Sequence, residues 1–345
     1  MVMKRTLLAV VLTLALSLIM LGTAAGKDFY KGKTVRIIVG YSPGGGFDTF
    51  SRLIGRYLGK HIPGNPTIIV MNMPGAGSLV AANRVYAMQP GDGLAVAVFN
   101  FGLIPQALTG DSTVTFDPQK YIWLGDPAIG SLPEVLWVHS DLPIRTLDEL
   151  KNSKKPVALG VTGIGSPSTA ASQFLASLGY PLKIIYGYRG TANVMAAMER
   201  KELDGRFMSQ ATMQGNYKRY IKSGLVRPVL SLGDDPRLTP IAGVPTFATL
   251  NLKGDQKKMA KFLVETWKLL RLFGLPPGTP ADRVEILRNA FIAALKSPEL
   301  QKDAERQGIV VSPASPETVT ETIRELYASP PEIIKAYKTL MTPKG

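Results

Sequence analysis

The sequence contains no cysteine among its 345 residues and only two histidines, His61 and His139. Without cysteine the chain forms no disulfide bond, holds no metal through thiolates and has no cysteine nucleophile. Each histidine stands alone, without Asp or Glu at metal-ligand spacing, and the G-x-S-x-G motif of many hydrolases is absent. We therefore expect no metal, no cofactor and no catalytic residues.

The N-terminus carries a short apolar segment. Lys4 and Arg5 precede an uncharged run at residues 7–21, and the small residues 22–25 follow it. A helix that spans a bilayer needs about 20 apolar residues, so this shorter run favours a secretory signal peptide over an uncleaved anchor. We expect residues 1–25 to be a signal peptide cleaved near Ala24 or Ala25, and the mature protein to be periplasmic.

The charge is strongly one-sided, with 40 Lys and Arg against 26 Asp and Glu and a formal net charge of +14. This charge favours anionic partners. The basic residues are scattered along the chain, and export separates the protein from nucleic acid. We therefore expect small anions to be the partners, and no nucleic acid.

Strand-like and helix-like runs alternate after the signal, which is typical of βα units on a largely parallel sheet. Asp48 stands where an N-cap is expected, before the helical spacing of Phe50, Leu53 and Ile54. Ser166 and Pro167 suit the N-cap and first position of another helix. Two further helices, at 281–295 and after Ser312, are expected to pack on the first domain. The predicted strands are 35–39, 67–71, 94–99, 157–161, 184–185 and a short one after 205.

Four strand-to-helix turns, at residues 41–46, 74–78, 162–166 and 188–191, are rich in small residues. Such turns let a ligand approach the backbone, and the helix that follows each one presents unpaired amides and a positive dipole. Arg189 has the geometry to hold a carboxylate, although a surface ion pair is an equal alternative. Three aromatic residues either line a ligand cleft at these turns or pack in the core: Tyr41, Phe101 and Tyr188. The candidate ligand-binding residues are Tyr41, Ser42, Gly45, Gly46, Asp48, Gly77, Ser78, Phe101, Thr162, Gly163, Gly165, Ser166, Tyr188, Arg189, Gly190 and Ser209.

The segments at 35–48, 72–77 and 90–93, in this order and spacing, resemble the Bug/TctC family of periplasmic receptors for tripartite tricarboxylate transporters. The resemblance implies an α/β, type II periplasmic-binding-protein fold, with two lobes of mostly parallel sheets and a ligand cleft between them. It implies a first lobe at 27–128 and 248–345 and a second at 129–247. It also implies that the loops at 41–48 and 162–166 hold an organic anion.

The leading hypothesis is an exported, monomeric binding protein that delivers a small carboxylate to integral membrane transporter subunits. One alternative keeps the binding role but assigns delivery to an ABC permease or a sensor kinase. Another is an exported hydrolase that acts on an anionic substrate, motivated by Ser42, Ser166 and Ser209 near the presumed cleft.

Overall fold

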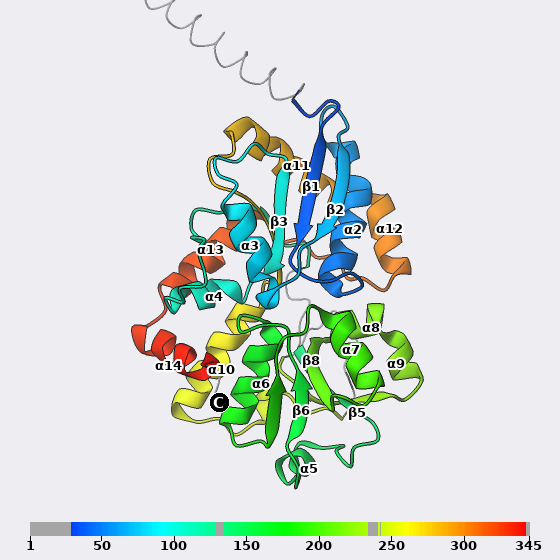
Figure 1. Cartoon of the computed structure of the whole chain (residues 1–345), viewed down its shortest axis with the longest axis vertical. Coiled ribbons are helices and arrows are strands. Elements are labelled where there is room, and N and C mark those ends of the chain that lie inside the picture. Colours follow the sequence, from blue (N-terminus) through cyan, green and yellow to red (C-terminus); the bar gives the residue numbers. More distant parts are fainter. Residues whose placement is uncertain (1–28, 129–133, 234–240, 242, 343–345) are drawn as a thin grey trace, which may run out of the picture.

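The computed structural model describes residues 29–128, 134–233, 241 and 243–342. These residues form two lobes, one above the other in Figure 1, and each lobe contains a five-stranded sheet covered by helices. The predicted signal peptide, residues 1–25, lies outside the described part. Within that part, no helix combines the length and the apolar character that crossing a membrane requires.

The first sheet has the strand order β2-β1-β3-β10-β4. β1 pairs in parallel with β2 and β3, whereas β10 runs antiparallel to β3 and β4. Because β1, β2 and β3 are parallel, their carboxyl ends share one edge, and the turns that follow them face the second lobe (Figure 1). The strands are β1 (Thr34–Val39), β2 (Thr67–Asn72), β3 (Ala95–Asn100), β4 (Ile122–Gly125) and β10 (Arg271–Leu275).

The second sheet repeats this plan in the order β7-β6-β8-β5-β9. β6 is parallel to β7 and β8, and β5 is the antiparallel strand between β8 and β9. The expectation of a two-lobed α/β fold is confirmed, with one inserted antiparallel strand in each sheet. The strands are β5 (Glu134–His139), β6 (Val157–Gly160), β7 (Leu182–Ile185), β8 (Gly205–Ser209) and β9 (Val226–Ser231).

The helices of the first lobe form because their apolar residues recur on one face. In α2 the residues Phe50, Leu53, Ile54 and Leu58 are buried against the sheet, and burial of each such side chain contributes about 1.5–3 kcal/mol. α11 packs on α2 and β4, α12 packs on α2 and α11, and α13 packs on β4. The helices are α2 (Gly46–Leu58), α3 (Leu79–Tyr86), α4 (Leu103–Leu108), α11 (Ala281–Lys296), α12 (Pro298–Arg306) and α13 (Pro316–Tyr327).

In the second lobe, α6 begins as its sequence predicts. The Ser166 hydroxyl accepts the Thr169 amide at 3.3 Å and Pro167 follows at the first helical position. The expected helix start at Asp48 is wrong, because Gly45 is the N-cap of α2 and Asp48 is the third helical residue. The helices are α5 (Leu147–Lys151), α6 (Pro167–Ser177), α7 (Thr191–Glu199), α8 (Gln210–Asn216) and α9 (Lys218–Lys222).

Two helices near the C-terminal end link the lobes. α10 (Gly254–Trp267) and α14 (Pro331–Met341) contact each other and α6, and α14 also contacts α4 (Figure 1). One buried apolar cluster runs through them from the first sheet to the second. The tail therefore packs on both lobes: α11, α12 and α13 follow the expectation, whereas α14 also lies against the second lobe. The predicted lobe boundaries, 27–128 with 248–345 and 129–247, stay a prediction.

Candidate functional site

A small cavity of about 50 Å³ lies where the two lobes meet. Residues of the first lobe and of the second lobe line it together, so it exists only while the lobes are in contact. Five of the residues predicted from sequence line it: Tyr41, Gly46, Thr162, Ser166 and Ser209. The other lining residues are Phe47, Glu134, Pro167, Ser168, Thr191, Arg206, Met208, Thr212, Leu270 and Arg271.

Three long helices begin at this cavity. Gly46, Pro167 and Thr191 are the first residues of α2, α6 and α7, and all three line the cavity. The first amides of a helix have no partner within the helix, and the helix dipole makes this end positive. The turns at 41–46, 162–166 and 188–191 are thus brought together from two lobes, in the arrangement that an anion site requires.

The glycines of the facing turns set how closely the lobes approach. A Cβ on Gly163 of the second lobe would lie 2.3 Å from the Gly77 amide nitrogen of the first lobe. A Cβ on Gly190 would lie 2.2 Å from the Ser42 hydroxyl. The Ser42 amide donates to the Arg189 carbonyl at 3.2 Å, so these turns meet backbone to backbone. The structure is therefore a closed form.

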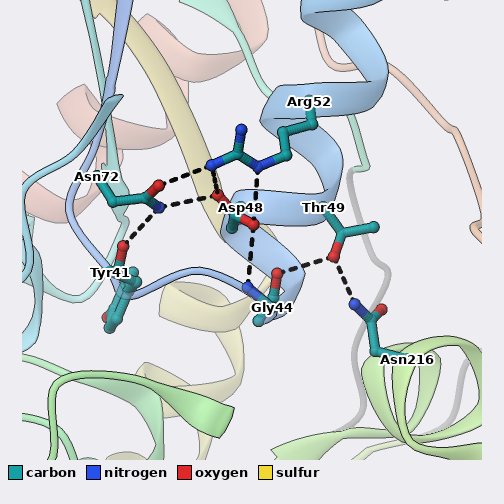
Figure 2. A network of polar contacts seen from close by, with 8 residues as sticks. Tyr41, Gly44, Asp48, Thr49, Arg52, Asn72 and Asn216 are labelled. Carbon is teal, nitrogen blue, oxygen red and sulfur yellow. Dashed lines mark hydrogen bonds and ion pairs between the residues drawn. The ribbon is translucent and has the colours of Figure 1, made fainter. Parts of the chain in front are cut away.

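Side-chain hydrogen bonds also cross between the lobes. The Tyr217 hydroxyl donates to the Gly44 carbonyl at 3.0 Å. The Asn216 amide donates to the Thr49 hydroxyl, which itself donates to the Gly45 carbonyl at 3.0 Å (Figure 2). These bonds hold the start of α2 against α8 and α9, and they form only on closure.

Asp48 is buried and fixes the shape of the turn before α2 (Figure 2). Its carboxylate accepts the Gly44 amide at 3.0 Å, Arg52 Nε at 3.1 Å and Asn72 Nδ2 at 2.8 Å. Burial alone would raise the pKa of Asp48, but these hydrogen bonds from Arg52, Gly44 and Asn72 outweigh burial and lower it. Asn72 also donates to the Tyr41 carbonyl at 2.9 Å. Asp48 therefore fixes the turn at the site, and it does not line the cavity. Its predicted contact with ligand stays a prediction.

A second buried network positions Tyr41. Its hydroxyl donates to the Gly77 carbonyl at 3.2 Å and accepts from Asn100 Nδ2 at 3.0 Å. The Ser78 hydroxyl accepts the Asn100 backbone amide at 3.1 Å. Burial raises the pKa of Tyr41 to about 12, so the phenol stays protonated at neutral pH. Gly77 and Ser78 thus belong to the network that positions Tyr41, and neither is part of the cavity wall. Ligand contacts by both stay a prediction.

Three buried charged residues at the cavity were missed by sequence reasoning: Glu134, Arg206 and Arg271. Burial raises the pKa of Glu134 to about 7, although Arg206 and Arg271 act to lower it. Burial also lowers the pKa of both arginines, and they remain charged at neutral pH. The available signal was a charged residue at the first or second position of a short apolar strand, as in the segments 134–139, 205–209 and 271–275.

Arg271 bridges the lobes from the first sheet. Its Nη2 donates to the Thr212 hydroxyl of α8 at 3.3 Å, and its guanidinium lies over the rings of Phe47 and Phe50 at 5.4 and 4.4 Å. A Cβ on Gly46 would lie 2.8 Å from Arg271 Nη2 and from the Thr212 hydroxyl. Glycine at this helix start thereby leaves room for the guanidinium.

Several predicted residues lie away from the cavity wall. Phe101 is fully buried in the apolar core, as its alternative interpretation held. The Arg189 side chain is exposed, and Tyr188 packs half-buried beside the core of the second lobe. Gly165 contacts Gln106, where a Cβ would lie 2.1 Å from the side-chain oxygen. Ligand contacts by these residues stay a prediction.

Closure itself can be tested at Gly163. Replacing Gly163 with Ala places a methyl group against the backbone of the facing turn, and we expect the equilibrium to shift at least tenfold toward an open form, about 1.4 kcal/mol. Small-angle scattering of the unliganded protein would detect the larger radius of gyration. Gly45→Ala is the matched control, because its Cβ would lie 3.5 Å from Thr191, an ordinary contact. Equal scattering from all three proteins would contradict the expectation.

Comparison with known proteins places the chain in a family. Residues 57–338 match the tripartite tricarboxylate transporter family receptor. A UPF0065 protein of Bordetella pertussis is 27% identical over 308 residues, which cover 85% of this chain and 86% of that protein. The solved structure of the periplasmic binding protein BugD has a TM-score of 0.72 at 22% identity, covering 92% of this chain and 100% of that one.

A further solved structure is similar in fold and was determined with a ligand. MatC from Rhodopseudomonas palustris with bound malate has a TM-score of 0.69 at 21% identity, covering 90% of this chain and 99% of that one. At this identity the likeness establishes the two-lobed fold.

Proposed function

The chain belongs to the tripartite tricarboxylate transporter receptor family, and from that premise we propose that it is a periplasmic receptor that captures a small organic carboxylate and delivers it to a tripartite transporter. This is a family of solute-binding receptors and not of enzymes. The expected anionic ligand and membrane partner are both consistent with this role. In the proposed form the receptor is a monomer that contacts the transporter's integral membrane subunits.

The observation that carries the proposal is the composition of the cavity between the lobes. Arg206 and Arg271 supply buried positive charge, and the helix starts at Gly46, Pro167 and Thr191 supply amide donors. Closure removes water around these groups, which strengthens their attraction for a carboxylate. MatC, a protein of the same fold, holds malate in its solved structure. We assign the carboxylate contacts to these groups together with Tyr41, Thr162 and Ser166.

The hydrolase alternative finds no support at the three serines that motivated it. Ser166 and Ser209 are N-caps whose hydroxyls accept helix amides, and Ser42 donates to Asn193 Oδ1 at 2.9 Å. Among the described residues that line the cavity there is no histidine to act as a base. Within the described part, no cluster of His, Asp or Glu could hold a metal ion.

Ligand binding can be tested by thermal unfolding with a panel of di- and tricarboxylates, hydroxy acids and amino acids. A ligand that binds only the folded protein stabilises it by about 1.4 kcal/mol at tenfold excess over its dissociation constant. We expect at least one acid to raise the melting temperature, and neutral sugars of similar size to leave it unchanged. A panel in which no acid shifts the transition would contradict the proposal.

Delivery is a separate question from binding. We expect uptake of the bound acid by vesicles that contain the tripartite membrane subunits to require this protein. Uptake with an ABC permease in their place, or signalling through a sensor kinase, would instead support the alternative partners.

A further inference from the structure

One buried carboxylate at the cavity has an oxygen without a hydrogen-bond partner. Glu134 is 5% exposed and lines the cavity, and its Oε2 makes no hydrogen bond in the described structure. Arg206, also 5% exposed, donates from Nε to the Phe207 carbonyl at 3.0 Å, while its Nη1 has no acceptor among the described residues. A buried charged group without a partner is costly, so both atoms require polar groups that the described residues do not supply.

Two hydroxyl groups near Glu134 already donate to other acceptors. Ser209 stands directly opposite Glu134 in the pairing of β5 with β8, but its hydroxyl donates to the Thr212 hydroxyl at 2.7 Å. The Tyr41 hydroxyl, also on the cavity wall, donates to the Gly77 carbonyl. A hydroxyl has a single proton to donate, so neither group can also serve Glu134. A ligand in the cavity is therefore the natural source of the missing donor.

The charges around the cavity are balanced. Arg206 and Arg271 both act on the charge of Glu134, and Arg271 also acts on that of the fully buried Asp126. Asp126 is satisfied within the protein, because it accepts the amides of Leu270 and Arg271 at 2.7 Å and that of Ala128 at 2.8 Å. A ligand carboxylate placed beside Glu134 Oε2 would therefore set one acceptor against another. A ligand with both an acceptor and a donor would match Arg206 and Glu134 together.

We propose that Glu134 is a specificity-determining residue, which selects acids that carry a hydrogen-bond donor, a hydroxyl or an ammonium group, close to their carboxylate. This inference rests on the proposed function and narrows its ligand class. The carboxylate binds toward Arg206 and the helix starts, and the donor binds Glu134 Oε2. The cavity is compact, so a single small ligand must satisfy both groups.

The test compares matched acids on the intact mature protein by titration calorimetry. Four-, five- and six-carbon diacids are each supplied unsubstituted, with a 2-hydroxyl and with a 2-amino group, as in succinate, malate and aspartate. We expect a substituted acid to bind at least tenfold more tightly than its unsubstituted partner. Equal or tighter binding of the unsubstituted diacids would overturn the inference while leaving the proposed function intact. Failure of every acid to bind would remove both.

Two substitutions at Glu134 distinguish the donors. Glu134→Leu removes the acceptor, so we expect the preference for the substituted acid to disappear in either case. Glu134→Gln keeps an acceptor oxygen but removes the charge, so we expect it to retain most of the preference for a hydroxy acid and to lose it for an amino acid. Glu325→Gln, on the exposed face of α13, is the control and leaves the preference unchanged. Circular dichroism verifies that Glu134→Leu is folded. If the folded variant still prefers the substituted acid as strongly as the wild-type protein does, the inference is overturned. If the variant does not fold, the comparison of matched acids on the wild-type protein decides.

Discussion

Replacing Arg206 with methionine is expected to weaken carboxylate binding more than 100-fold, about 3 kcal/mol. Truncation of one member of a buried, hydrogen-bonded charge pair costs about 2–5 kcal/mol, because the other member stays buried without its partner. Arg206 is 5% exposed, lines the cavity and has an Nη1 without an acceptor in the described structure. A bound carboxylate would therefore form a buried charge pair with it. Methionine preserves most of the apolar volume. Titration with an acid that stabilises the wild-type protein would measure the loss.

Arg189→Met is the matched control for this prediction. Both residues are arginines of the second lobe, but the Arg189 side chain is exposed and lies off the cavity wall. An exposed charge contributes little to binding, typically less than about 1 kcal/mol, so we expect the affinity of Arg189→Met to fall less than about fivefold. If Arg189→Met bound the acid more weakly than Arg206→Met, Arg189 and not Arg206 would be the arginine that binds the carboxylate, as the sequence suggested.

The comparison of these two arginines shows what the sequence could and could not predict. Local patterns located the strands, the turns and the capped start of α6, because each depends on residues close together in the chain. Arg189 stood out because it lies inside a glycine-containing turn, which is a local feature. Arg206 lies within β8, and only the packing of the two lobes against each other makes the cavity that its side chain lines.

The role of Asp48 was missed for a related reason. Its position before an apolar helical pattern resembled an N-cap, and a cap depends on the next three residues alone. The structure instead uses its carboxylate to join the Gly44 amide, Arg52 and Asn72, and Asn72 comes from the end of β2. A contact between residues 24 positions apart follows from the parallel pairing of β1 with β2, which no local pattern specifies.

Glu134 also predicts a change in stability with pH. Burial raises the pKa of Glu134 in the folded protein to about 7, from 4.5 in an exposed chain. Between these values the folded protein retains a proton that the unfolded chain has lost, so the free energy of unfolding falls as the pH rises from about 4.5 to about 7. The full effect is about 3 kcal/mol, since each unit of pKa corresponds to about 1.36 kcal/mol.

Glu134→Gln removes this dependence, because the amide is neutral at every pH of the window. We expect the free energies of unfolding of the variant and the wild-type protein to differ little near pH 4.5. Near pH 8 we expect this difference to have changed by about 3 kcal/mol in favour of the variant. Urea unfolding at the two pH values, without ligand, measures the difference. Every other titrating group is common to both proteins and cancels. A difference independent of pH would show that folding does not raise the pKa of Glu134 above its value in the unfolded chain.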